Sequence, residues 1–272
     1  MTTDLPTHQA LPTEGSVKRI VIVIPCYNEA ERLDTSAIAE WLARRDDVTV
    51  LFVNDGSKDR TLFVLEGLRQ RNLEQVEVLD LGKNQGKAEA VRRGLLRGLE
   101  LQPTYVGYFD ADLATPLAEL ERLIGIATDT ETQVLLASRV ALLGRQIERS
   151  LRRHYLGRVF ATMASIILRL RVYDTQCGAK LLRCTSALET ALREPFLSRW
   201  AFDVELIGRL LNPPPNTPPL QASDIVEEPL LVWRDVPGSK LTASHMLRSA
   251  LDLLTIDQEL RRARAAMQRR GA

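Results

Sequence analysis

Residues 20–25, with the sequence IVIVIP, form an unbroken apolar run rich in valine and isoleucine. A run of this length and composition is typical of a β-strand that is buried on both faces. Comparable runs follow at residues 48–53, 76–81, 105–109 and 134–137. Helical patterns separate them, at about residues 30–45, 60–71 and 87–100 and again after Pro116. Strands that alternate with helices predict an α/β fold, with a mostly parallel sheet covered on both faces.

The pattern changes after Ser138. We expect residues 139–172 to be helical and rich in arginine, followed by a loop and by helices at about residues 184–193 and 200–211. The segment NPPPNTPP at 212–219 predicts a rigid surface loop, because proline continues neither a helix nor a central strand. A late strand at 225–233 and a long amphipathic helix at 239–270 complete the expected order.

The composition is that of an ordinary globular protein, with 272 residues of which 45% are apolar and 26% charged. A formal net charge of +1 argues against a general polyanion-binding surface, so no nucleic-acid partner is expected. The three cysteines lack the spacing of a zinc site or redox pair, which predicts reduced thiols in a cytoplasmic protein. We find no apolar run long enough to span a bilayer and no signal peptide.

Acidic residues follow three of the expected strands: Glu29 after the first, Asp55 after the second, and Asp110-Ala111-Asp112 after the fourth. In such sheets ligands bind beyond the carboxyl ends of the strands. Two carboxylates that flank one small residue at the end of a buried strand repel each other unless a cation lies between them. Oxygen ligands of this kind suit Mg²⁺ or Mn²⁺ that holds a diphosphate, so Asp110 and Asp112 are the expected metal ligands.

Other nucleotide-binding classes do not fit the residues after the first strand. The sequence PCYNE at 25–29 stands where a dinucleotide-binding unit has G-x-G-x-x-G. The chain also lacks a Walker lysine motif and the Gly-rich, Arg- and Lys-containing first loop of a nucleotidyltransferase. The sequence GKNQGK at 82–87 places two lysines before a helix, which is typical of an anion-binding turn.

Taken in order, the motifs resemble the family 2 inverting glycosyltransferases with the GT-A fold. The resemblance is strongest to the branch of dolichyl-phosphate glucosyltransferases and other polyprenyl-phosphate glycosyltransferases. The similar segments are VIVIPCYNEAERL (21–33), FVNDGSKDRT (52–61), LGKNQGKAEAVRRG (81–94), YFDADLATP (108–116), SR (138–139), DTQCGAK (174–180), RWAFDVEL (199–206) and WRDVPGSK (233–240). These segments occur in the same order over roughly 220 residues, and such an ordered set identifies a family more specifically than any single motif.

The resemblance implies a Rossmann-like, mostly parallel sheet flanked by helices, with helical acceptor-side elements toward the C-terminus. We expect a flexible tail at 1–17 and a single catalytic domain at 18–238. Within that domain, residues 18–138 would form the nucleotide-binding half and residues 139–238 the acceptor half, and residues 239–272 would form a terminal amphipathic helix.

The resemblance also implies roles for individual residues. The donor-binding residues would be Pro25, Tyr27, Glu29, Asp55, Lys83, Lys87, Asp110, Ala111, Arg139 and Lys240. The metal, Mg²⁺ or Mn²⁺, would bind to Asp110 and Asp112. Arg139, Trp200 and Glu205 would form the acceptor side, and Asp174, Gln176 and Asp203 would be the catalytic residues.

The chemistry of the acceptor decides whether a base is needed. A lipid phosphate is already ionised at neutral pH, so positioning and electrostatics suffice. A hydroxyl acceptor requires a carboxylate to take its proton, and Asp174 and Asp203 are both candidates. The sequence leaves this choice open.

Residues 139–171 contain eight arginines and one acid, Glu148. Arg145, Arg149, Arg152 and Arg153 fall on one helical face. One interpretation is a surface that contacts anionic lipid headgroups and a polyprenyl phosphate, with the apolar run 159–168 in the membrane interface and Arg149 and Arg153 binding the acceptor. The other is a solvated face above a helix that completes the core.

The sequence departs from the wider family in two places. Ala114 stands where relatives of dolichyl-phosphate mannose synthase have glutamine, so the metal would rely on two carboxylates, phosphate and water. The Q-x-x-R-W motif of processive synthases is absent, since Phe196 precedes Leu197-Ser198-Arg199-Trp200, and this favours a single transfer.

The favoured hypothesis is transfer of glucose from UDP-glucose to polyprenyl phosphate by a cytoplasmic protein peripheral to the inner face of the membrane. GDP-mannose and UDP-N-acetylhexosamines remain open as donors. A soluble or glycan hydroxyl remains open as the acceptor, and so does a non-catalytic nucleotide-sugar-binding protein of the same fold.

Overall fold

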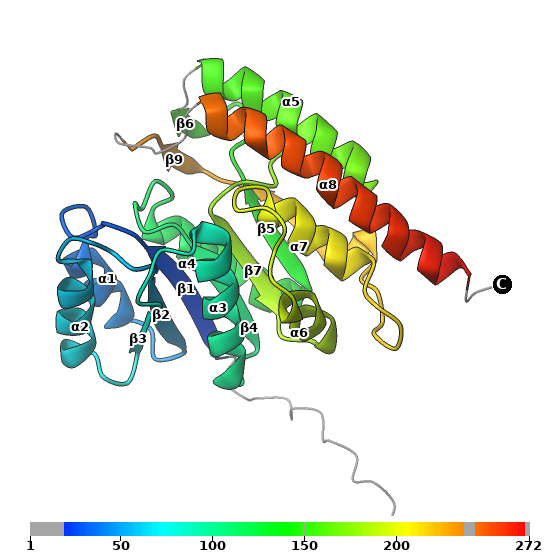
Figure 1. Cartoon of the computed structure of the whole chain (residues 1–272). Coiled ribbons are helices and arrows are strands. Elements are labelled where there is room, and N and C mark those ends of the chain that lie inside the picture. The colour runs from blue at the N-terminus through cyan, green and yellow to red at the C-terminus, as the bar shows by residue number, and fades with distance from the viewer. Residues whose placement is uncertain (1–18, 149–150, 237–242, 270–272) are drawn as a thin grey trace, which may run out of the picture.

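The computed structural model describes residues 19–148, 151–236 and 243–269. The main sheet contains β1 (Ile20–Cys26), β2 (Val48–Asn54), β3 (Val76–Asp80), β4 (Tyr105–Phe109), β5 (Val134–Ser138), β7 (Ala179–Arg183) and β8 (Ile225–Pro229). Their spatial order is β3-β2-β1-β4-β7-β5-β8 (Figure 1). In this sheet β7 is antiparallel to both of its neighbours, and the remaining pairs are parallel. The predicted mostly parallel α/β sheet is therefore confirmed.

Helices cover both faces of this sheet. One face carries α1 (Thr35–Leu42), α2 (Thr61–Arg71) and α4 (Leu117–Thr130), whose buried side chains share one core cluster. The other face carries α3 (Lys87–Glu100), α6 (Ser186–Arg193) and α7 (Phe202–Leu211). The helices α5 (Leu151–Leu168) and α8 (Ala243–Gln268) run side by side and pack on α7 (Figure 1). The 3₁₀ turn η1 (Ala222–Asp224) precedes β8.

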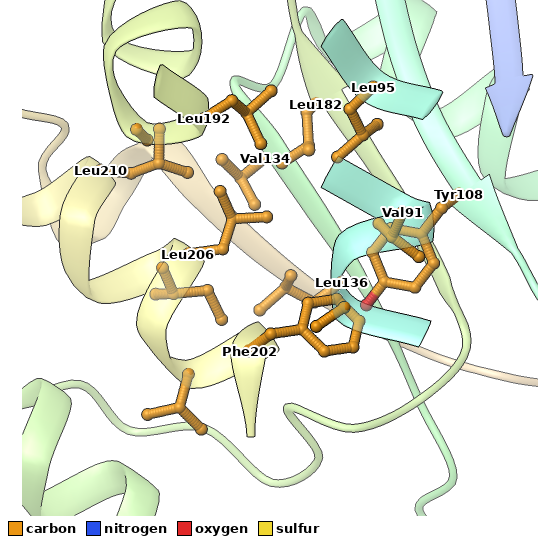
Figure 2. Close-up of a cluster of buried hydrophobic side chains, with 14 of the residues drawn as sticks. Val91, Leu95, Tyr108, Val134, Leu136, Leu182, Leu192, Phe202, Leu206 and Leu210 are labelled. Carbon is orange, nitrogen blue, oxygen red and sulfur yellow. The ribbon is translucent and has the colours of Figure 1, made fainter. Parts of the chain in front are cut away.

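The core cluster on the face that carries α3, α6 and α7 joins the two halves of the chain. Figure 2 shows side chains of α3 and α7 meeting above the sheet, where Leu206 and Phe202 lie close to the strands. The rings of Phe202 and Tyr108 have centroids 5.8 Å apart, within the range of a favourable aromatic pair. Because α3 precedes the middle of the chain and α7 follows it, this core holds the strand ends of both halves in fixed relative positions.

The strand β7 differs from the sequence-based prediction of a loop at residues 173–183. It inserts between β4 and β5, with Ala179 opposite Phe109 and Lys180 opposite Tyr108. Its sequence, AKLLR, is short and contains two basic residues, so it lacks the apolar run or alternation by which strands are recognised. The lysine is nevertheless buried. Only long-range pairing reveals this strand.

Two further expectations were wrong. Residues 139–172 are not one helical segment: 139–145 form a loop, β6 (Gln146–Glu148) follows, and α5 begins at Leu151. The expected strand at 225–233 is two strands, because β8 ends at Pro229 and β9 (Val232–Arg234) pairs with β6 in a separate sheet. The pairing of β6 with β9 joins segments that are distant in sequence, so it leaves no local periodicity by which it could be predicted. The loop before β6 turns at Gly144, whose φ of 81° favours glycine.

Smaller differences concern the ends of elements. The helix expected from residue 30 begins at Thr35, where the Asp34 side chain caps it by accepting from the Ala37 amide at 2.9 Å. The expected tail at 1–17 and residues 239–242 of the expected last helix lie outside the described residues. Within the described ranges, no helix is both long enough and apolar enough to cross a membrane.

The centre of β4 requires glycine. A Cβ atom on Gly107 would lie 2.3 Å from the Lys180 carbonyl oxygen, so Gly107→Ala forces β4 and β7 apart. We expect the free energy of unfolding to fall by about 1–3 kcal/mol, measured by urea denaturation. In α2, Gly67→Ala is the control, because a Cβ there meets no atom within 4 Å. It should stabilise the protein by about 0.5–1 kcal/mol. Equal effects of the two substitutions would contradict this account.

Candidate active site

Hydrogen bonds connect the loops after β1 and β2 at the carboxyl edge of the sheet. The Asp55 amide donates to the Cys26 carbonyl at 2.9 Å. The side chain of Asn28 accepts from the Lys58 amide at 2.8 Å, and the Asn28 amide donates to Ser57 Oγ at 3.0 Å. Pro25 and Tyr27 are half-buried in this region and Glu29 is buried. The predicted donor-binding residues of the first two loops therefore lie at one edge.

Asp55 organises the lysine-bearing turn at 82–87. Its carboxylate accepts from the amides of Gln85 and Gly86 at 2.6 and 2.9 Å, and from the Asn84 side chain at 3.0 Å. Burial raises the pKa of Asp55, although these amide contacts act in the opposite direction. Gly86 has a φ of 95°, a conformation that favours glycine. Asp55 thus fixes the turn that leads into α3, and its contact with the donor remains a prediction.

The two lysines of this turn differ in environment. Lys83 is exposed, whereas Lys87 opens α3 and places its Nζ 2.5 Å from Asp110 Oδ1. Burial lowers the pKa of Lys87, but the charge of Asp110 and its hydrogen bond outweigh burial and raise it. Asp203 and Asp112 add to this effect. Lys87 therefore carries a positive charge among three carboxylates.

Asp110 and Asp112 follow β4, as predicted, and Ala111 between them is buried. The Asp110 amide donates to the Gly178 carbonyl at 2.9 Å, and Asp112 accepts from the Ala114 amide at 3.1 Å. Burial, and then the charge of Asp110, raise the pKa of Asp112. The two carboxylates therefore repel each other.

The donor set at Asp110 and Asp112 fits a divalent metal that is shared with a ligand. Among the described residues, no cluster of three or more His, Cys, Asp or Glu side chains is placed to hold a metal alone. Mg²⁺ is commonly bound by one or two carboxylates together with substrate phosphates and water. The pair has that composition, and the side chain of Asp110 is 35% exposed.

Arg139 and Asp174 form a bidentate pair beside this site. Arg139 donates through Nε and a terminal nitrogen at 2.6 and 2.9 Å, and its amide donates to the same carboxylate at 3.1 Å. Asp174 also accepts from the Gln176 amide at 3.1 Å, and the Gln176 side chain donates to the Trp200 carbonyl at 3.1 Å. The structure thus connects Arg139 with the predicted catalytic residues Asp174 and Gln176.

A buried polar cluster lies at the start of α7. Lys180 Nζ is 2.9 Å from Asp203 Oδ1, and it donates to Tyr108 Oη at 2.8 Å and to the Cys177 carbonyl at 2.7 Å. The Tyr108 hydroxyl donates to Asp203. Burial raises the pKa of Asp203 and lowers the pKa of Lys180 to about 7. Asp203, a predicted catalytic residue, is therefore held by Lys180 and Tyr108, neither of which was a predicted site residue.

The remaining residues that were predicted to bind the acceptor differ in how the structure describes them. Glu205 accepts from the amides of Leu197 and Ser198 at 2.8 and 3.4 Å and pairs with Arg209 at 2.6 Å, so its carboxylate supports the loop that carries Trp200. The predicted residues Arg149 and Lys240 lie outside the described residues. Arg153 lies in the first turn of α5, but its side chain is not described.

The family model for Glycosyl transferase family 2 matches residues 21–189 of this chain. This chain is a family 2 glycosyltransferase. It is 32% identical over 270 residues to a dolichyl-phosphate beta-glucosyltransferase from Mus musculus, covering 91% of this chain and 78% of the relative. It is 33% identical over 241 residues to the Drosophila melanogaster protein of the same name, covering 81% of this chain and 68% of the relative.

Solved structures show the same fold. Glucosyl-3-phosphoglycerate synthase from Mycobacterium tuberculosis, in complex with Mn²⁺, UDP and glucosyl-3-phosphoglycerate, aligns with a TM-score of 0.63. The alignment covers 93% of this chain and 87% of that one at 18% identity. The same enzyme with Mg²⁺ and UDP aligns with a TM-score of 0.61 at 19% identity. The predicted GT-A fold of the glycosyltransferase is confirmed.

Three residues of the glycosyltransferase that were not among the predicted site residues lie at the site. Gly178 makes room for Asp110, because a Cβ there would lie 1.9 Å from Asp110 Oδ2. Lys180 holds Asp203. Arg199, on the loop before α7, packs on Gly86, and its charge counteracts the raised pKa of Asp55. All three lie in motifs quoted above, but only the pairing of β7 with β4 brings the first two to the site.

The buried Lys180–Asp203 pair yields a stability test. Lys180→Met leaves the Asp203 carboxylate buried without its cation and should cost roughly 3–5 kcal/mol in urea denaturation. The double variant Lys180→Met, Asp203→Leu removes both charges, so its cost should be smaller than the sum of the single costs. Lys58→Met, at an exposed lysine, should leave the free energy of unfolding unchanged. Additive single costs would contradict the pairing.

Proposed function

We propose that this glycosyltransferase transfers glucose from UDP-glucose to a polyprenyl phosphate, using Mg²⁺ or Mn²⁺ at Asp110 and Asp112. The observation that carries the proposal is the similarity to relatives named for dolichyl-phosphate glucosyl transfer. That similarity covers 91% of the chain for the mouse relative and thus includes the acceptor half. The UDP found in solved structures of the same fold supports a uridine donor.

The donor would lie across the carboxyl ends of β1, β2 and β4. A divalent metal there would neutralise the diphosphate leaving group without a proton. Lys87 stands beside Asp110, and Asp55 holds the turn from which Lys87 projects. Positive charge would thus lie where negative charge develops as the sugar leaves, the arrangement that stabilises such a transition state.

The acceptor phosphate would enter a pocket of about 140 Å³ between Arg139 and α5. The pocket is lined by Arg139, Val140, Ala141, Gly157, Arg158, Tyr173 and Asp174. The guanidinium of Arg158 lies 4.6 Å from the centre of the Tyr173 ring. A guanidinium matches the geometry of phosphate oxygens, and an ionised phosphate requires no strong base. In this position the acceptor would also lie near Asp174, which lines the same pocket.

We propose that α5 contacts the cytoplasmic face of a membrane, where a polyprenyl phosphate would be embedded. Tyr155, Val159 and Ile166 share one helical face and are 67%, 59% and 71% exposed. Arg158 is exposed beside them. On the neighbouring α8, Leu251 and Leu254 are 58% and 61% exposed. Apolar side chains beside basic ones are typical of helices that bind anionic lipid surfaces.

The proposed reaction predicts that UDP release requires both lipid and metal. Purified protein is incubated with UDP-glucose and Mn²⁺, with short-chain polyprenyl phosphate, with inorganic phosphate, or with neither. We expect UDP release only with the lipid, and loss of at least a hundredfold on chelation or in Asp112→Asn, on the order of one lost transition-state contact. Asp129→Asn, at an exposed position of α4, is the control that keeps activity. Lipid-independent turnover would favour a hydroxyl acceptor.

The proposed membrane contact predicts loss of vesicle binding when the exposed face of α5 becomes polar. Binding is measured by flotation with vesicles that contain phosphatidylserine and polyprenyl phosphate. Val159→Ser with Ile166→Ser should weaken it roughly tenfold or more, since burying one such side chain contributes on the order of 1.5 kcal/mol. Phe63→Ser with Leu73→Ser removes apolar side chains that are 68% and 73% exposed near α2, and binding should be unchanged. Equal losses would contradict a role for α5.

A further inference from the structure

The two oxygens of Asp110 have different surroundings. Oδ2 lies close to the backbone of Gly178: a Cβ atom added to that glycine would lie only 1.9 Å from Oδ2. Oδ1 is 2.5 Å from Lys87 Nζ. Oδ1 lies farther from Gly178, at 2.8 Å from the same Cβ position, and it is the oxygen that holds the ammonium group. A metal that approaches Asp110 from the site meets an oxygen that already has a cation beside it.

Lys87 can leave this contact without movement of the backbone. Its main chain begins α3 directly after the turn that Asp55 holds through the amides of Gln85 and Gly86. Its flexible four-carbon side chain is 33% exposed and carries a compact point charge. Asp203 is nearby, but its Oδ1 is already bound to Lys180 and Tyr108. Asp112 is the other expected metal ligand, so the metal would occupy it together with Asp110. Once the metal is bound, the anion that can receive the ammonium is therefore a ligand of the site.

We propose that Lys87 is an internal counter-cation of Asp110 that gives way to the divalent metal and pairs with the nucleoside diphosphate that arrives with it. This inference rests on the proposed function only for the identity of these two ligands. A metal alone must compete with the ammonium for Asp110 Oδ1 and is repelled by it. A metal that enters with a diphosphate meets less competition, because the diphosphate attracts the ammonium away.

The exchange makes metal and nucleotide binding mutually dependent. Each ligand favours the state in which Lys87 has left Asp110, so each raises the affinity of the other by the same factor. When the nucleoside diphosphate departs, Lys87 returns to Asp110 and weakens the remaining metal contact. Lys87 is thus a positioning residue for the metal as well as a neighbour of the donor, which distinguishes it from the exposed Lys83.

The test measures Mn²⁺ binding without turnover. Free Mn²⁺ is followed by electron paramagnetic resonance as the full-length protein is titrated, with and without UDP. Lys87→Met removes the ammonium group, so it should bind Mn²⁺ alone roughly fivefold to tenfold more tightly than the wild type. The strengthening of Mn²⁺ binding by UDP should shrink by a similar factor. Lys87→Arg keeps a cation, and a guanidinium group can bind a carboxylate through two hydrogen bonds. It should compete with the metal for Asp110 more strongly than lysine does, so this variant should bind Mn²⁺ alone more weakly than the wild type.

Arg93→Met is the matched control, since it removes one positive charge from an exposed position of the same helix. It should leave both affinities unchanged. Unchanged or weaker Mn²⁺ binding in Lys87→Met overturns the exchange. If that variant does not fold, Mn²⁺ affinity in Lys87→Arg equal to or above that of the wild type overturns it. Failure of the wild type to bind Mn²⁺ even with UDP would instead defeat the proposed metal-dependent function, and this inference with it.

Discussion

The antiparallel pairing of β7 with β4 is the contact on which the rest of the structure depends. It places Lys180 opposite Tyr108 and brings Gly178 against Asp110. The close approach is possible because Gly107 has no side chain to separate the two strands. Because β7 lies between β4 and β5, the same pairing joins the strands of the N-terminal half to β5 and β8. One strand therefore completes the sheet and also brings Gly178 and Lys180 to the site.

The N-terminal half of the fold could be predicted from the sequence because its signals are local. Buried parallel strands read as apolar runs, and acids after the strands mark the edge at which Asp55 and Asp110 lie. Residues 139–238 were harder to predict because several of their strands are short and pair across long sequence distances, as β6 does with β9. Lys180 was missed for a related reason, since a lysine in a five-residue strand gives no sign that it will be buried.

Three cation–carboxylate pairs surround the strand ends: Arg139 with Asp174, Lys180 with Asp203, and Lys87 with Asp110. Taking such charges out of water costs free energy that the attraction within a pair often only offsets, and apolar side chains of similar volume would stabilise the fold as well or better. Stability therefore does not account for these pairs. In the proposed function they serve the reaction: Arg139 and Lys180 hold Asp174 and Asp203 in fixed positions, whereas Lys87 supplies a cation that can pair with the diphosphate.

The loop that carries Trp200 is tied to α8 as well as to the site. Ser198 accepts from the amides of Trp200 and Ala201 at 3.2 and 2.8 Å, and its hydroxyl donates to Asp252 of α8 at 2.5 Å. Asp252 lies between the exposed Leu251 and the buried Leu253. One side of α8 therefore packs on the protein at this turn, and the other side is exposed. On its other side the loop reaches the site through the bond between Gln176 and the Trp200 carbonyl. The proposed lipid-facing helices and the proposed acceptor side of the site are therefore parts of one connected structure, as transfer to a membrane-embedded polyprenyl phosphate would require.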